Sequence, residues 1–230
     1  MDFNRLPTPC YVVDEALIER NLKVLKGVME RTGARILLAQ KAFSMYALYP
    51  LMGEYLCGAT ASGLYEARLC QEEMAAPMRA KGRELENHIF SPAYQEKDFQ
   101  EILLYCDHIV FNSWKQLERF GRQAKEAGKS IGLRINPECS TQESHAIYDP
   151  CAPGSRLGVT QEGFMRALAQ GGDELSWLDG LHFHTLCEQD SDDLEKTLDA
   201  VEEKFGPYLP RMKWINFGGG HHITRDGYDI

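Results

Sequence analysis

Short, continuously apolar segments alternate with amphipathic segments along nearly the whole chain, and this alternation restricts the possible folds more than any other feature. Segments such as "NHIF", "HIVF" and "SIGLRI" lack the regular polar positions of a strand that has one face in water. Strands of this kind are covered on both faces, which is typical of a parallel sheet between layers of helices. We expect strands in seven segments: residues 34–41, 54–60, 87–93, 107–113, 130–137, 178–185 and 213–220.

The segments between these strands have the spacing of amphipathic helices. In residues 14–31, Ile18, Leu22, Leu25 and Met29 follow one another at steps of four, three and four residues. Regular alternation of helix and strand over 230 residues, 43% of them hydrophobic, predicts one large α/β domain of the (β/α)8 TIM-barrel type. An open seven-stranded sheet is the alternative.

The expected barrel is incomplete. A closed barrel needs an eighth strand that pairs with the first, and the final segment "HHITRDGYDI" contains no apolar run. We therefore expect this chain to be a truncated version of a longer protein. A further short strand, "PCYVVD", is expected before the first helix.

Composition excludes several classes of partner. A net charge of −9 and a pI near 5.3 argue against nucleic acid, because proteins that bind a phosphate backbone present a basic face. The N-terminus lacks the basic and apolar regions of a signal peptide, and no segment approaches the roughly 20 apolar residues of a membrane helix. We expect no membrane partner and a cytoplasmic location.

Cysteine usage predicts reduced thiols. The seven cysteines include no CxxC pair, and Cys57, Cys70 and Cys106 lie in apolar runs. We expect neither a disulfide framework nor a metal site.

Lys41 ends the first expected barrel strand, in "ARILLAQKAFS". A lysine at a strand end most often reaches the surface. Desolvation would instead lower its pKa and free the amine to act as a nucleophile, for example in a Schiff base. In a barrel, the carboxyl ends of the strands carry the catalytic groups.

The sixth and seventh strands also end in residues that can carry chemistry. "NFGGGHH" contains Gly218, Gly219 and Gly220, whose bare backbone can direct N–H groups at a phosphate, although a flexible turn is the simpler interpretation. "GLHFHT" places His182 and His184 on one face of a strand. A zinc site would need a third ligand, for which only His221 and His222 are available. An imidazole that stacks on an aromatic ring fits better.

A Schiff-base lysine, a stacking histidine and a phosphate-binding glycine triplet together describe a pyridoxal phosphate site. The chain resembles the fold type III pyridoxal phosphate decarboxylases, and within them the carboxynorspermidine/carboxyspermidine decarboxylases of polyamine synthesis. "YDPCAPGSRLG" and "HFHTLCEQ" are the motifs specific to that subfamily. The full set of matching motifs is "TPCYVVDE", "LLAQKAFS", "FSPAYQEKDF", "HIVFNSWKQLERF", "GLRINPE", "IYDPCAPGSRLGV", "GLHFHTLCEQ" and "NFGGGHHITR".

The resemblance implies roles for individual residues. It makes Lys41 the residue that bonds to the cofactor, places His184 against the pyridine ring, and assigns the phosphate to Gly218–Gly220. Cys187 stands where relatives often have a serine on the phosphate side.

For four further residues the alternatives stay open. Arg134 and Arg156 lie in segments that line the cofactor side of the barrel in relatives, and a salt bridge at the surface or strand end is an equal alternative. Glu138 and Asp149 follow the fifth strand and could meet a cationic substrate, although a solvated loop is the default interpretation.

Relatives continue beyond this sequence. They have an eighth strand with a Glu-Pro-Gly motif and a β-sheet domain that contributes to a dimer. The resemblance therefore implies that residues 1–14 form a strand of that sheet domain, that residues 15–230 form an incomplete barrel, and that the full-length protein is a homodimer.

The function that follows from the resemblance is the decarboxylation of carboxynorspermidine or carboxyspermidine to norspermidine or spermidine, with low activity for this chain alone. A small single-barrel protein that binds pyridoxal phosphate without turnover is one alternative. A second alternative is another decarboxylase or a racemase of the same fold. The third and simplest alternative is an α/β scaffold without a functional site.

Overall fold

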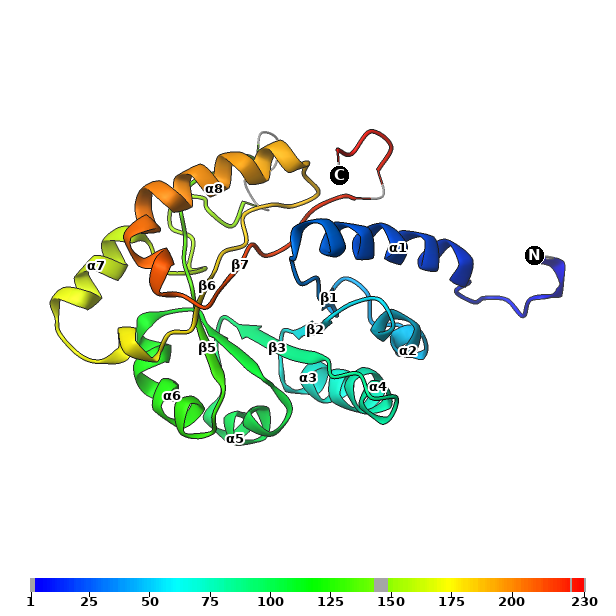
Figure 1. The fold of residues 1–230 in the computed structure, drawn as a ribbon, viewed down its shortest axis with the longest axis horizontal. Helices are drawn as coiled ribbons and strands as arrows, with labels where there is room; N and C mark the ends of the chain where they lie inside the picture. Colours follow the sequence, from blue (N-terminus) through cyan, green and yellow to red (C-terminus); the bar gives the residue numbers. More distant parts are fainter. Residues whose placement is uncertain (1–2, 143–148, 224, 230) are drawn as a thin grey trace.

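A seven-stranded, wholly parallel sheet forms the centre of the molecule. The computed structural model describes residues 3–142, 149–223 and 225–229. The strands pair in sequence order from β1 to β7, so each strand lies beside its neighbours in the chain. Figure 1 shows that the sheet curls into an open half-barrel. The strands are β1 Leu38–Ala39, β2 Gly58–Ala61, β3 Glu86–Ser91, β4 His108–Phe111, β5 Ser130–Arg134, β6 Gly180–His182 and β7 Trp214–Asn216.

Helices connect successive strands and cover the outer face of the sheet (Figure 1). None of the helices in the described part of the chain has the length and apolarity needed to cross a membrane. The helices are α1 Glu15–Thr32, α2 Tyr49–Gly53, α3 Leu64–Cys70, α4 Ala76–Ala80, α5 Glu96–Tyr105, α6 Trp114–Glu126, α7 Gln161–Ala169 and α8 Ser191–Phe205.

Local sequence fixes where several helices begin and end. Asp14 caps α1, because its Oδ1 accepts the N–H of Ala16 at 3.0 Å and satisfies a donor that the first helical turn leaves unpaired. Ser113 caps α6 in the same way. Gly33 ends α1 with φ of 73°, a left-handed conformation that glycine adopts at no steric cost. These signals explain why the expected helix over residues 14–31 is confirmed almost to the residue.

The pleat separates the two faces of the sheet. The outer face carries apolar side chains such as Ile109, Ile131 and Leu181, each fully buried under the helices. The inner face carries polar residues, among them His88 and Arg134, in register with their neighbours. This division gives the barrel a hydrophobic shell and a polar interior. The α/β prediction with parallel strands is confirmed.

Trp214 fills the interior of the half-barrel toward the amino ends of β5 and β6. Its indole N–H donates to Ser130 Oγ at 2.8 Å. The ring lies over Gly180 and Gly132, where a Cβ would approach within 2.1 Å and 2.4 Å of the indole atoms. The two glycines therefore make room for the largest side chain of the interior.

Three details differ from the sequence expectations. Residues 9–14 form no strand in this structure, where no neighbouring strand pairs with them, and Tyr11 is 96% exposed. The assignment of residues 1–14 to a sheet domain stays a prediction. The first barrel strand is shorter than expected and spans only Leu38–Ala39. Helix α2, which packs on α1 and on the outer face, was missed because Pro50 and Gly53 resemble loop residues in the sequence.

The seven cysteines are all free in the structure. Cys70 and Cys106 are fully buried in the two apolar clusters of the outer face. Burial raises the pKa of the Cys70 thiol to about 12 and also raises the pKa of the Cys106 thiol. These thiols are therefore core residues and not reactive groups.

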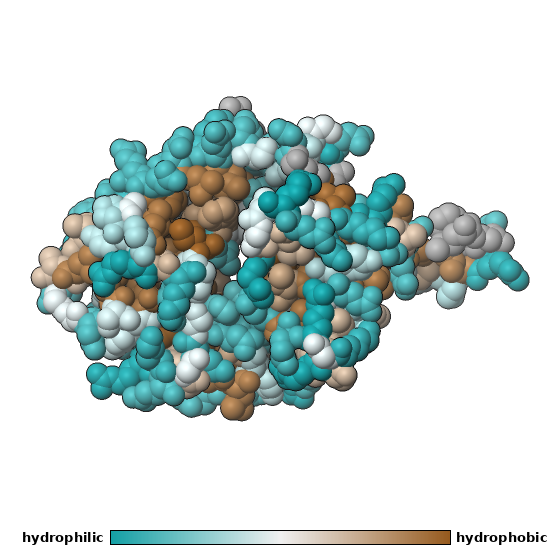
Figure 2. Space-filling model, viewed as in Figure 1, coloured by the Kyte–Doolittle hydropathy of each residue, from teal (hydrophilic) through white to brown (hydrophobic). Residues whose placement is uncertain are grey.

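Strands β1 and β7 form the two edges of the sheet in the described part of the chain. On the outer face of β7 and just beyond it, Ile215 and Phe217 are 38% and 42% exposed. Figure 2 shows apolar surface on the side of the molecule where α8 and β7 lie. This edge region is less well covered than the centre of the sheet.

Gly180 tests the packing around Trp214. We expect Gly180→Ala to lower the free energy of unfolding by about 1–3 kcal/mol, because the new methyl group overlaps the indole ring. Chemical denaturation of both proteins measures the difference. As a control, Gly27→Ala in the middle of α1 has no atom nearer than 3.9 Å and should be neutral or stabilising. Equal stability of the Gly180 variant and the unsubstituted protein would contradict this packing.

Candidate functional site

The predicted site residues lie at the carboxyl ends of the strands and therefore at one end of the half-barrel. Lys41 lies in the turn after β1, His184 lies two residues after β6, and Gly218 follows β7 by two residues. Burial, and after it the positive charge of Lys41, lowers the pKa of the His184 imidazole. Residues that are more than 140 positions apart in the sequence thus share one electrostatic environment.

Lys41 is held by a turn with a buried anchor. The Gln40 side chain is 1% exposed, and its Oε1 accepts a hydrogen bond from Tyr49 Oη at 3.2 Å. The N–H groups of Ala42 and Phe43 both donate to Ala39 O, which closes the turn. The Lys41 side chain itself is exposed. Of the two alternatives for Lys41, the structure has the one in which the side chain reaches solvent, because the half-barrel is open beside β1. Its role as a nucleophile remains a prediction.

His184 connects the ends of β6 and β7. Its Nδ1 accepts the Gly219 N–H at 3.0 Å, so the ring proton of the neutral imidazole lies on Nε2. The carbonyl oxygen of His184 accepts a hydrogen bond from Arg134 Nη2 at 3.1 Å. Burial, followed by the charges of Lys41 and Arg134, lowers the pKa of His184 to about 4. The imidazole is therefore neutral at physiological pH.

The first and last residues of the glycine triplet have a backbone conformation that glycine adopts most readily. Gly218 and Gly220 have φ of 74° and 96°, and a Cβ at these positions would lie 2.5 Å from Phe183 O and 2.2 Å from Leu186 O. A Cβ at Gly219 would meet no atom within 4 Å. The triplet therefore packs against the loop after β6 on two sides and faces open space at its centre.

Two of the three glycine N–H groups have partners within the protein. Gly218 N–H donates to Asn216 Oδ1 at 2.8 Å, and Gly219 N–H donates to His184. The Gly220 N–H has no acceptor among the described residues. The assignment of all three glycines to a phosphate remains a prediction, and Gly220 has the N–H that is free to donate.

Arg134 is buried and has no carboxylate partner in the part of the chain that the structure describes. It is 4% exposed, its guanidinium lies 4.7 Å from the centre of the Phe90 ring, and burial lowers its pKa to about 10. Its Nε is buried without an acceptor. A surface salt bridge is therefore not the role of Arg134, and an unsatisfied buried donor is a feature expected of a ligand site.

His182 and Phe90 lie beside Arg134 in the interior of the half-barrel. Phe90 was not predicted as a site residue, and His182 was considered only as a possible zinc ligand. The two rings are 5.6 Å apart, and the His182 Nδ1 is buried without a partner. Burial lowers the pKa of His182 to about 3. The alternation of side chains along a strand could have identified both residues, because Phe90 and His182 point to the same face of the sheet as Arg134.

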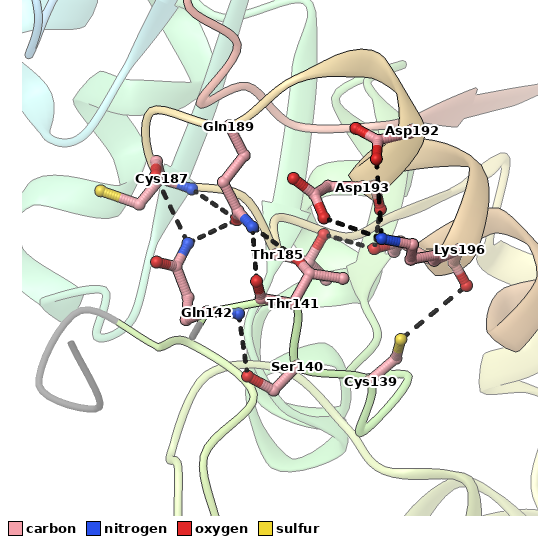
Figure 3. A network of polar contacts seen from close by, with 11 residues as sticks. Cys139, Ser140, Thr141, Gln142, Thr185, Cys187, Gln189, Asp192, Asp193 and Lys196 are labelled. Carbon is pink, nitrogen blue, oxygen red and sulfur yellow. Dashed lines mark hydrogen bonds and ion pairs between the residues drawn. The ribbon is translucent and has the colours of Figure 1, made fainter. Parts of the chain in front are cut away.

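The loops after β5 and β6 are joined by side-chain amides (Figure 3). Gln189 Nε2 donates to Thr141 O at 2.7 Å and to Thr141 Oγ1 at 2.8 Å, and Gln142 Nε2 donates to Gln189 Oε1. Cys187 enters this network through its backbone only, and its side chain is exposed and points away from the two glutamines. The phosphate-side role assigned to Cys187 stays a prediction.

Asn112 fixes the loop that carries the subfamily motif "YDPCAPGSRLG". Its side chain donates to Arg156 O at 2.9 Å and accepts the Gly158 N–H at 2.9 Å. The Arg156 side chain is exposed and has no ion pair among the described residues. The start of the motif, Ile147 and Tyr148, lies outside the described residues.

The two acidic residues of the loop after β5 are positioned by short turns. Glu138 has φ of 52°, and its N–H donates to Asn136 Oδ1 at 2.8 Å. Asp149 Oδ1 accepts the Cys151 N–H at 2.8 Å. Glu138 is exposed and Asp149 is half-buried. A role of either in substrate binding remains a prediction.

The zinc alternative for His182, His184, His221 and His222 is not supported. Within the described ranges, the only group of three potential metal ligands is formed by Glu86, His88 and His108, at the opposite end of the sheet. His221 instead shares a hydrogen bond with Tyr228 Oη at 2.9 Å.

The parallel half-barrel, with Lys41, His184 and the glycine triplet at its carboxyl edge, matches the barrel half of the fold type III decarboxylases. No protein-family model matches the chain. Over all 230 residues the chain is 41% identical to carboxynorspermidine/carboxyspermidine decarboxylase of Campylobacter jejuni. The matched region covers 56% of the length of that protein. The chain is therefore a homologue of carboxynorspermidine decarboxylase over about half of that enzyme's length.

Two further comparisons agree. A carboxyaminopropylagmatine decarboxylase of Synechocystis is 39% identical over 225 residues, which cover 98% of this chain and 54% of that protein. The crystal structure of carboxynorspermidine decarboxylase from C. jejuni in complex with norspermidine superposes with a TM-score of 0.81 at 40% identity, over 97% of this chain and 53% of that one. The chain thus spans about half the length of the curated relatives it matches.

The pKa of His184 predicts a dependence of stability on pH. In the unfolded chain His184 has the ordinary histidine pKa of 6.5, whereas in the folded protein its pKa is about 4. The unfolded state therefore binds more protons between these values, and the contribution of His184 to stability is lost as the pH falls from about 6.5 to about 4. His182 acts in the same direction.

An NMR titration of the imidazole signals measures the pKa of His184 directly, with His184→Gln to assign the signal. We also expect His184→Gln to lose less stability than the unsubstituted protein between pH 7 and pH 5. A His184 signal that titrates in the ordinary histidine range would show that the imidazole is not enclosed as the structure describes.

Proposed function

We propose that Lys41 binds pyridoxal phosphate and that this chain provides the cofactor-binding half of a decarboxylase for carboxynorspermidine and carboxyspermidine. The observation that carries the proposal is the convergence of Lys41, a neutral His184 and the glycine triplet at one edge of the sheet. Similarity to carboxynorspermidine decarboxylases supports the choice of substrate.

The residues present fit this cofactor. Its phosphate is matched by the Gly220 N–H and by the open space at Gly219. Its aromatic ring is matched by His184, whose neutral imidazole can stack without desolvating a charge. The unsatisfied Nε of the buried Arg134 is a cationic donor for an anionic group.

Fold type III decarboxylases use pyridoxal phosphate, which, when bound, draws off the electron pair left behind as CO2 departs. Lys41 Nζ would hold the cofactor through its amine, and the exposure of Lys41 would leave that position accessible to a substrate. His184 keeps its proton on Nε2, because Nδ1 is occupied by the Gly219 N–H. Arg134 holds the backbone of His184 and so fixes the position of the imidazole.

The charge of the protein suits a polyamine. The net charge is −9, and the loops at the carboxyl edge carry the exposed acids Glu138, Glu188 and Asp190. A negative potential of this kind attracts a cationic substrate and raises its rate of association. Homodimer formation, inferred from the resemblance, remains part of this proposal.

Borohydride reduction tests the role of Lys41. When the chain is incubated with pyridoxal phosphate and reduced, we expect mass spectrometry to find the added mass on the peptide that contains Lys41. Lys41→Ala should lose at least about 90% of this labelling, since no other residue of the site has an amine. Lys115→Ala, on the exposed face of α6, is the matched control. Labelling spread equally over surface lysines would overturn the assignment.

Substrate identity is tested by CO2 release. We expect carboxynorspermidine and carboxyspermidine to give CO2 in preference to diaminopimelate and ornithine. Carboxyaminopropylagmatine belongs in the same assay, because the Synechocystis relative is named for it and is 39% identical. Labelling of Lys41 without CO2 from any substrate would favour a protein that only binds the cofactor, and exchange of the α-proton without CO2 would favour a racemase.

A further inference from the structure

Glu86, His88 and His108 form a cluster at the end of the sheet opposite Lys41. Glu86 and His108 are the first residues of β3 and β4, and His88 pairs directly with His108 in the parallel register. The proposed cofactor site lies at the carboxyl ends of the strands, so it does not use this cluster. The side chains of the cluster therefore need a separate explanation.

The three residues are of the types that bind metal ions, and their potential ligand atoms lie close to one another. His88 Nε2 lies 3.0 Å from Glu86 Oε2, and the rings of His88 and His108 stack with centroids 3.9 Å apart. One potential ligand atom from each of the three residues lies within 4.8 Å of the others. Two imidazoles and one carboxylate are a common ligand set for zinc in proteins.

The histidines retain unused hydrogen-bonding atoms. His88 is 8% exposed, and its Nδ1 and that of His108 are buried without any partner among the described residues. An unpaired buried nitrogen costs free energy, and a bound ion changes how the rings orient and which nitrogen carries a proton. Two such atoms in stacked neighbouring rings are unusual for a purely structural pair.

We propose that Glu86, His88 and His108 bind a divalent transition-metal ion, with Zn²⁺ as the chemically best matched ion. Neutral imidazole and carboxylate suit Zn²⁺, and water can complete the coordination. Glu86 has 28% of its side chain exposed, against 10% for His88, so an ion can reach the carboxylate from the amino end of the sheet.

Arg35 competes with the ion for the carboxylate. Its Nη2 lies 2.9 Å from Glu86 Oε1, and its own side chain is 58% exposed. A cation at the cluster has to share or displace this ion pair. The affinity of the site is therefore set partly by a surface arginine that contributes no ligand.

The location assigns the ion a structural role. The amino-terminal face of a β/α barrel is where residues support stability, whereas the carboxyl face carries catalysis. An ion here would join the first residues of β3 and β4, and it would lie beside Trp214, whose ring is 5.6 Å from that of His108. The expected consequence of binding is a higher melting temperature.

Titration with ZnCl2 tests the proposal on the whole chain. Isothermal calorimetry should show one site that His108→Gln and His88→Gln weaken at least about 10-fold each. NMR should show the imidazole signals of His88 and His108, and not those of His182 or His184, changing on binding. Zinc bound at the exposed Cys10 or Cys187 would persist in both variants, and binding of that kind alone would overturn the proposal.

Arg35 provides a second test that leaves the buried histidines intact. Arg35→Met should tighten zinc binding several-fold, because it removes the cation that competes for Glu86. Arg79→Met is the matched control, since Arg79 makes a similarly exposed ion pair with Glu84 at 3.0 Å, outside the cluster. If Arg35→Met and Arg79→Met leave the affinity equally unchanged, Glu86 is not a ligand and the site is refuted.

Discussion

The parallel pairing of β1 to β7 in sequence order is the constraint on which the rest of the structure depends. It places the carboxyl ends of all seven strands at one end of the half-barrel and their amino ends at the other end. Lys41, His184 and Gly219 therefore lie at the same end of the half-barrel, and Gly219 donates a hydrogen bond to His184. The same pairing brings Glu86, His88 and His108 together at the opposite edge. One register thus creates two separate polar centres.

The site is held together mainly by backbone groups and by buried side chains of the interior. Gly219 fixes the tautomer of His184, Arg134 holds the His184 carbonyl, and Gln40 anchors the turn of Lys41. Gln40 and Arg134 are themselves buried, with 1% and 4% of their surface exposed. An unsatisfied Arg134 Nε and an open Gly219 are the features that a bound anion would complete. The support is thus present before any ligand binds.

Much of the fold was predictable, because apolar runs and helix caps are local signals. Lys41 and the glycine triplet could be found as strand-end residues, but the bond between His184 and Gly219 could not, since it joins residues 35 positions apart. The exposure of Lys41 depends on the open edge of the sheet. The histidines of "ENHIF" and "DHIVF" became neighbours only through the register of β3 and β4, so their cluster was missed.

The central claim is that a cofactor bonds to Lys41 and rests between His184 and the glycine triplet. A crystal structure of the chain soaked with pyridoxal phosphate tests it most directly. We expect continuous electron density from Lys41 Nζ to the cofactor, the His184 ring against the pyridine, and the phosphate at Gly220. A cofactor bound elsewhere, with Lys41 unmodified and the Gly219 to His184 bond undisturbed, would contradict the account.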